Sequence, residues 1–170
     1  QITKDSEAIM KKFKELDIAI WGEYEFAVKE IATMELSKVK GITFRNDNKI
    51  YKTEDRPRLE NLDLLPLPAR DLLNNKLYKA PDTGKPIAYI LTGRGCPHRC
   101  IYCAVSVASG YKLYTRSVDS IIREIEECYY KFKIKDFFFR SDTFTWDEKW
   151  VISLCQKIIE KKPLRQLMRK

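Results

Sequence analysis

The stretch IAYILTGRGCPHRCIYCA, residues 87–104, joins a short apolar run to a tight group of cysteines. The run at 87–91 has the composition of a strand that is buried on both faces, as in a parallel sheet. Cys96, Cys100 and Cys103 follow it, and the whole chain holds five cysteines. An odd, clustered set favours a metal or redox site over a disulfide framework.

The spacing of these cysteines leaves two kinds of metal site open. A structural zinc ion takes four protein ligands, so a zinc site here needs His98 as the fourth. A cubane iron–sulfur cluster suits the spacing better, because each thiolate takes one iron and the remaining iron stays open. We expect the other two cysteines, Cys128 and Cys155, to be core residues, since each lies on the apolar stripe of a predicted helix.

The second half of the chain alternates strands and helices. Its predicted elements after the cysteine loop are a helix over 118–132 capped by Ser117, a strand over 137–139, and a helix that starts at a Thr145–Glu148 capping box and stops at Pro163. This order is typical of a parallel α/β fold. Chemistry in such folds lies at the carboxyl ends of the strands. The cysteine loop and residues 140–145 are therefore expected at the same edge of the sheet.

The first half of the chain reads as a separate region followed by a proline-rich linker. Its predicted elements are a strand over 17–21, a helix over 24–34, and a hairpin of strands 41–44 and 50–52 around the turn 46–48. Five prolines are spread over residues 54–86, where they favour an extended path and interrupt sheet pairing. We predict a linker there.

Composition narrows the class of protein. The net charge is +8, but residues 161–170 carry five basic side chains and no acidic one, so most of the excess is local. We interpret this as a solvated helix end rather than a nucleic-acid surface. The chain has no membrane-length apolar run and no secretion signal, which favours the reducing cytoplasm. Because it begins with Gln1, we expect a fragment of a longer protein.

The cysteine motif, with Tyr102 just before its last cysteine, resembles the signature of radical S-adenosylmethionine enzymes. LDLLPLPARDLL (62–73), YTRSVDSIIREIEE (114–127) and FFFRSDTFT (137–145) are similar to the subgroup with an N-terminal cobalamin-binding domain, and IAIWGEYE (18–25) resembles a late turn of that domain. The resemblance implies an α/β fold: the end of a Rossmann-like cobalamin-binding domain over 1–53, the linker over 54–86, and the first βα units of a partial TIM-type barrel over 87–170.

The resemblance also implies cofactors and roles. Cys96, Cys100 and Cys103 would hold a 4Fe-4S cluster whose open iron binds S-adenosylmethionine, and reductive cleavage would give a deoxyadenosyl radical. Methyl transfer with cobalamin, or cyclisation, of a small-molecule substrate would follow, with flavodoxin or ferredoxin as electron donor. The backbone at Tyr102 would lie near the adenine, Ser141 and Asp142 near the amine, and Gly22 near the corrin.

Two departures and two alternatives remain. Tyr24 replaces the second glycine of the family's Gly-Glu-Gly-Glu turn, and the cobalt-ligating histidine motif is not among these residues, whose only histidine is His98. A radical methylthiotransferase acting on transfer RNA or a ribosomal protein has a similar loop, but its family carries a second cysteine-rich region, and no cysteine precedes Cys96 here. The other alternative is a non-enzymatic zinc-binding module.

Overall fold

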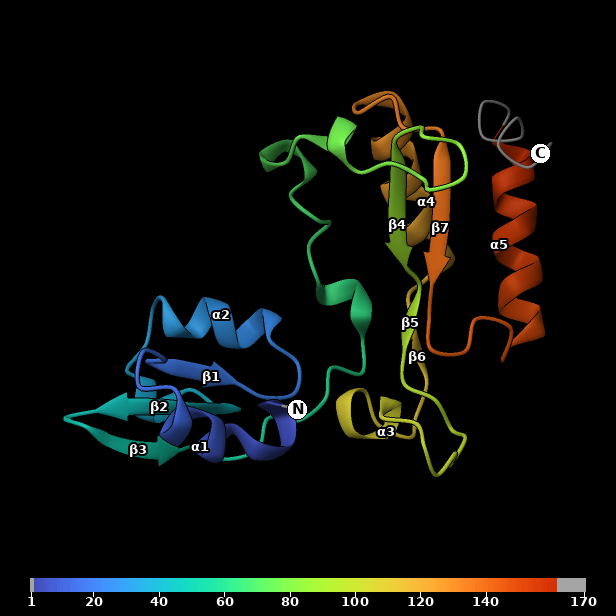
Figure 1. The fold of residues 1–170 in the computed structure, drawn as a ribbon. Helices are drawn as coiled ribbons and strands as arrows, with labels where there is room; N and C mark the ends of the chain where they lie inside the picture. Colours follow the sequence, from blue (N-terminus) through green and yellow to red (C-terminus); the bar gives the residue numbers. More distant parts are fainter. Residues whose placement is uncertain (1, 162–170) are drawn as a thin grey trace. The chain divides into compact units, whose positions relative to one another are not determined.

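The computed structural model describes residues 2–161, which form two compact units (Figure 1). Of the described residues, the first unit takes 2–60 together with 96–112, so the cysteine loop groups with the N-terminal part of the chain. The second takes residues 61–95 and 113–161. The proline-rich segment predicted as a linker is thus divided between the units. Among the described residues, no helix has the length and apolar character needed to cross a membrane.

The first unit is built on an antiparallel sheet of β1 (Ile18–Ile20), β2 (Ile42–Asn46) and β3 (Lys49–Lys52), in that order. Asp47 and Asn48 form the turn between β2 and β3, with φ of 48° and 62°. Asp and Asn tolerate this left-handed backbone, which two-residue hairpins require. The predicted hairpin is confirmed. The Rossmann-like description is not confirmed, because these three strands pair without a parallel neighbour.

Helices cover both faces of this sheet. Ala27 of α2 (Glu25–Ile31) packs with Ile42 and Phe44 on one face. On the other face the hydroxyl groups of Ser6, in α1 (Ile2–Lys12), and Thr43 are 2.7 Å apart in a hydrogen bond. Figure 1 shows the two helices on opposite sides of the sheet.

The helix predicted over 24–34 is shorter than expected, since α2 ends at Ile31. Met34 lies beyond the helix and is exposed, and Phe26 is also exposed, so neither belongs to the core. A short 3₁₀ turn at Leu36–Lys38 then leads into β2.

The second unit is built on one parallel pair, β4 (Ile87–Leu91) with β7 (Asp136–Arg140), which confirms the α/β prediction for this half of the chain. The helices α4 (Val118–Tyr130) and α5 (Glu148–Glu160) complete its core. The buried core residues are Ala88, Ile90, Ile121, Ile122, Ile125, Cys128, Ile134, Leu154 and Ile158. The two core residues from β4, Ala88 and Ile90, lie at alternate positions of the strand, so the helices cover one face of the strand pair.

The opposite face of the pair carries aromatic side chains. Tyr89 and Phe138 are register partners with ring centroids 5.4 Å apart, and they are 47% and 54% exposed. The prediction that residues 87–91 are buried on both faces is therefore wrong for the described structure. The reason is that no described element packs over Tyr89 as α4 packs over Ala88 and Ile90.

The helix starts agree with the sequence in one case and differ in the other. Ser117 caps α4, because its hydroxyl oxygen accepts a hydrogen bond from the Ser120 amide at 3.1 Å. The capping box predicted at Thr145 and Glu148 is wrong: Asp147 caps α5, accepting from the Trp150 amide at 3.0 Å. Asp is as good a cap as Thr, and here the later residue is used. Pro163 lies outside the described residues.

A buried network of charged side chains holds the segment before β4 against the rest of the second unit. That segment runs through 3₁₀ turns at Leu62–Leu64, Arg70–Leu72 and Asn75–Leu77. Glu124 of α4, 1% exposed, binds the guanidinium groups of both Arg70 and Arg116. Arg70 also donates to the Tyr89 carbonyl at 2.9 Å, and Arg116 donates to the Leu91 carbonyl at 3.0 Å. One carboxylate thus connects three parts of the unit.

Replacing Glu124 with Ala should lower the free energy of unfolding by about 3–5 kcal/mol, because it leaves two guanidinium groups in a buried site without their counter-charge. The matched control is Glu127→Ala on the same helix, whose partner Lys131 is solvent-exposed and whose loss should cost below about 0.5 kcal/mol. Urea denaturation followed by circular dichroism measures both. Equal losses in the two variants would show that the network does not stabilise this unit.

Candidate metal centre and cofactor site

The cysteine loop leaves the sheet after β5 (Gly93–Arg94) and returns at β6 (Tyr114–Thr115), which pairs antiparallel with β5. A single helical turn, α3 (Val105–Ala108), lies inside the loop. Cys96 is half-buried, whereas Cys100 and Cys103 are exposed. All three are free thiols. The Cys103 amide donates to the Cys100 carbonyl at 3.1 Å, so a tight turn joins the last two cysteines.

The donor chemistry of this loop fits a thiolate-bound metal, but the side chains are not gathered around one point. Within residues 2–161, no three His, Cys, Asp or Glu side chains converge closely enough to hold a metal ion. Three free thiols on one loop, two of them exposed, are nevertheless the donor set that iron–sulfur clusters use. Binding a cluster would therefore require the loop to draw its three sulfurs together.

The other two cysteines behave differently from those in the loop. Cys128 is fully buried in the core between α4 and the sheet, as predicted. Burial raises the pKa of its thiol to about 11, so the thiolate that a metal needs is strongly disfavoured. Cys155 is only half-buried, because it borders an open cavity beside α5.

The carboxyl edge of the parallel pair carries the predicted residues Ser141 and Asp142, directly after β7. The Gly95 amide donates to Asp142 Oδ2 at 2.7 Å, and the Thr143 amide donates to the Ser141 hydroxyl at 3.3 Å. A Cβ on Gly93 would lie 2.9 Å from the Tyr114 carbonyl oxygen and 3.3 Å from Ser141 Oγ. The ends of β4 and β7 therefore meet in close contact, as the strand order predicted.

These contacts limit what Asp142 can do. One of its carboxylate oxygens holds the backbone immediately before Cys96, a role that the sequence did not indicate. A positively charged ligand group would have to share the carboxylate with the Gly95 amide. That Ser141 and Asp142 bind the amine of a cofactor stays a prediction.

The turn after β1 contains the predicted residue Gly22, with φ of +83° and nothing within 4 Å of where a Cβ would stand. Its open side is compatible with the close approach of a ligand. The next residue, Glu23, accepts a hydrogen bond from the Leu59 amide at 2.6 Å. Trp21 is buried, and its indole Nε1 has no hydrogen-bond partner in the described structure. That Gly22 contacts the corrin stays a prediction. Tyr102, between Cys100 and Cys103, is 89% exposed, and its backbone as a contact for the adenine also stays a prediction.

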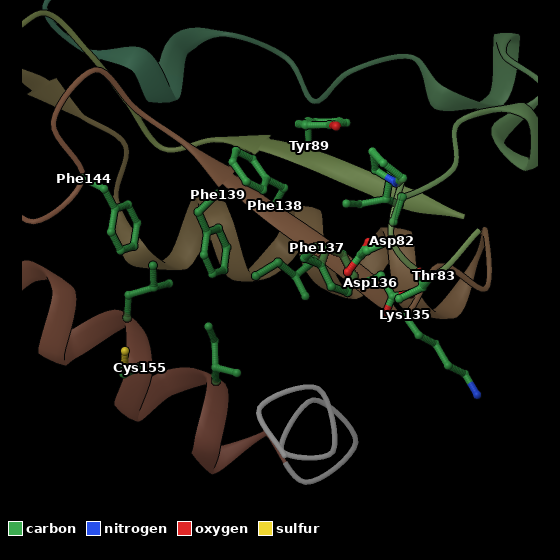
Figure 2. Close-up of a pocket in the computed structure, with 16 residues that line it drawn as sticks. Asp82, Thr83, Tyr89, Lys135, Asp136, Phe137, Phe138, Phe139, Phe144 and Cys155 are labelled. Atoms are coloured by element: carbon green, nitrogen blue, oxygen red, sulfur yellow. The ribbon is translucent and has the colours of Figure 1, made fainter. Parts of the chain in front are cut away.

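A cavity of about 740 Å³ lies in the second unit between β7 and α5 (Figure 2). Figure 2 shows Phe139 and Phe144 pointing toward α5, where Cys155 lies. The two phenyl rings are stacked, with their centroids 5.7 Å apart. None of the predicted site residues lines this cavity. It follows the side of β7 that does not pair with β4, so we interpret it as an unfilled part of the core.

Alkylation should separate the cysteines of the metal-free protein. At pH 8 iodoacetamide should modify Cys100 and Cys103 first, because both thiols are exposed. Cys128 should stay unmodified until the protein is denatured, since a pKa of about 11 leaves roughly one thiol in a thousand ionised. Peptide mass spectrometry after timed quenching measures the order. Early modification of Cys128 in the folded protein would contradict its placement in the core.

Asp142→Ala should lower the free energy of unfolding by about 1.5–3 kcal/mol, because the Gly95 amide loses a charged acceptor. Asp142→Asn keeps a carbonyl oxygen in that position and should lose clearly less. Urea denaturation compares the two variants. If Asn and Ala were equally destabilising, the carboxylate would act through its charge and not as the acceptor for Gly95.

Comparison with known proteins shows what this chain is similar to. Residues 90–164 match the radical SAM superfamily. An uncharacterized methyltransferase of Pyrococcus horikoshii, PH0819, is 32% identical over 162 residues, which are 92% of this chain and 35% of that protein. The anaerobic magnesium-protoporphyrin IX monomethyl ester cyclase of Synechocystis is 38% identical over 100 residues, 56% of this chain and 20% of that protein. The chain therefore spans about a third or less of these relatives.

Solved structures agree on the fold. The cobalamin-dependent S-adenosylmethionine radical enzyme OxsB, with aqua-cobalamin and S-adenosylmethionine bound, superposes on 95% of this chain and 23% of its own, with a TM-score of 0.72 and 14% identity. The radical S-adenosylmethionine methyltransferase TsrM of Kitasatospora setae covers 95% of this chain and 32% of its own, with a TM-score of 0.65 and 17% identity. The sequence match places residues 90–164 of this chain in the radical SAM superfamily, and the solved structures share the chain's fold.

Proposed function

We propose that this chain is part of a radical S-adenosylmethionine enzyme in which Cys96, Cys100 and Cys103 hold a 4Fe-4S cluster. The observation that carries the proposal is the position of the Cys-x3-Cys-x2-Cys loop. It follows β4, the first strand of a parallel pair, inside the residues that match the family. When bound, the cluster supplies the electron that cleaves S-adenosylmethionine.

The chain's own residues would bind and position the two cofactors. The loop thiolates are the cluster ligands, and three ligands leave one iron open for the amino and carboxylate groups of S-adenosylmethionine. Ser141 and Asp142, at the carboxyl edge of the parallel pair, supply a hydroxyl and a carboxylate, which suit an ammonium group. The backbone at Tyr102 is the proposed contact for the adenine.

For the reaction, methyl transfer is the first candidate. The relative that matches over 92% of this chain is named a methyltransferase, and TsrM and OxsB, the latter cobalamin-dependent, share the fold. The turn at Gly22 is the proposed cobalamin contact in this chain, because nothing lies within 4 Å of where a Cβ at Gly22 would stand. Cyclisation of a small molecule is the second candidate, favoured by the similarity to a cyclase over 100 residues of this chain. We expect flavodoxin or ferredoxin as the electron donor.

The first test is the metal content of the full-length protein, purified without oxygen. We expect about four irons and a matching amount of labile sulfide per chain, because three thiolates with one open iron site suit a cubane. Stoichiometric zinc without iron would overturn the proposal in favour of a zinc-binding module. A second iron–sulfur cluster held outside residues 1–170 would instead favour the methylthiotransferase alternative.

The same experiment continues with activity. The reduced protein should convert S-adenosylmethionine to deoxyadenosine and methionine, and Cys100→Ala should abolish both cluster binding and this conversion. Cys155→Ala is the matched control, because that thiol lies in α5 outside the loop, and it should retain iron and activity. Deoxyadenosine formation by Cys100→Ala at the wild-type rate would refute the ligand assignment.

A further inference from the structure

A short segment at the end of the first unit contacts the cysteine loop. Residues 56–59, which we call the strap, follow β3 and contain Pro57, whose ring fixes the backbone. Arg58 reaches from the strap to the loop: its Nη1 donates to the Ala108 carbonyl at 2.8 Å, and its Nη2 lies 3.5 Å from the Val107 carbonyl. These carbonyls belong to the end of α3, where the helix itself offers no partner. A cation there also complements the helix dipole.

The contact extends from α3 to the first cysteine. Gly110 follows α3 with φ of +83°, and its carbonyl accepts a hydrogen bond from the Cys96 amide at 3.2 Å. A Cβ on Gly110 would lie 2.7 Å from Nε of Arg58, so the guanidinium occupies the space that a side chain would need. Arg58 therefore packs against the residue that fixes the backbone of Cys96.

The strap is itself fixed on both sides of Arg58. Before it, Arg56 donates to the Lys40 carbonyl at 3.0 Å and binds the carboxylate of Glu30 in α2. After it, the Leu59 amide donates to Glu23 Oε2 at 2.6 Å. Arg58 is thus held between the Gly22–Glu23 turn and the sheet before it reaches the loop, which reduces the entropy lost when it binds.

We propose that Arg58 is a positioning residue for the cysteine loop. By holding the end of α3 and Gly110, it fixes the Cys96 amide, and with it the first cluster ligand, in a defined place relative to the Gly22–Glu23 turn. The contact stands on the structure alone, whereas its consequence for a cluster rests on the proposed function. The two are therefore tested by separate measurements.

The contact is tested in the metal-free, full-length protein by hydrogen exchange with mass spectrometry. In Arg58→Ala, peptides from residues 96–112 should exchange roughly three- to tenfold faster, as loss of one hydrogen-bonded anchor predicts. Arg58→Lys, which keeps the positive charge but has one nitrogen in place of the guanidinium fork, should lie between. The matched control is Lys40→Ala, a cation of the same unit whose ammonium group pairs with the exposed Glu54 at 2.9 Å, and it should leave the loop unchanged. An unchanged loop in Arg58→Ala would overturn the proposal.

A second variant tests whether the effect comes from the contact between Arg58 and Gly110 and not from a general loss of folding. Gly110→Ala places a methyl group against the guanidinium and should speed exchange of the loop in the wild-type background. In the Arg58→Ala background the same change should have a smaller effect, because the conflicting side chain is gone. Equal effects in both backgrounds would show that the two residues do not act together.

The consequence for the cluster is measured by the rate at which an iron chelator removes iron from the reconstituted protein. We expect several-fold faster loss from Arg58→Ala than from wild type or Lys40→Ala. If the wild-type protein took up no cluster, the proposed function would fail while the exchange result still decided the role of Arg58. If the cluster formed and was equally stable in all variants, positioning of the cluster ligand would be disproved and the proposed function would stand.

Discussion

The parallel pairing of β4 with β7 is the constraint on which the rest of the second unit depends. Ala88 and Ile90 face the helices from this pair, and α4 and α5 are ordered by covering them. Because parallel strands end at the same edge, Gly95 and Asp142 come within a hydrogen bond of each other, and the cysteine loop begins at that bond. The loop therefore begins at the edge of the sheet where parallel α/β folds carry their chemistry.

The loop is held by contacts to its backbone at Gly95, Cys96 and Gly110. Gly95 is bound by Asp142, and Cys96 is bound by Gly110, which Arg58 supports. The sulfurs of Cys100 and Cys103 remain exposed and uncommitted to structure. The contacts that stabilise the loop are thus different from the sulfurs proposed to bind the cluster. This division leaves the thiolates able to change position when a cluster binds. It also means that residues far from the motif in sequence determine where the motif lies.

Sequence patterns predicted the elements whose causes are local. The run 87–91, the Ser117 cap and the hairpin turn at Asp47 and Asn48 each depend on a few neighbouring residues, and the structure contains all of them. Three features were not predicted: the pairing of β1 with this hairpin, the exposed face at Tyr89 and the cap at Asp147. Long-range packing decides the first two, and a choice between two good caps decides the third. The roles of Glu124 and Arg58 could not be predicted either. In the sequence, a carboxylate in a buried ion pair and an arginine that binds a loop look the same as ordinary surface charges.

The central claim is that the three-cysteine loop holds a 4Fe-4S cluster with one iron open to S-adenosylmethionine. Electron paramagnetic resonance of the reconstituted, reduced full-length protein tests this most directly. A reduced cluster should give a spectrum whose g values shift when S-adenosylmethionine is added, because the molecule binds the open iron. A cluster spectrum that S-adenosylmethionine leaves unchanged, or no cluster spectrum after reconstitution, would contradict the account.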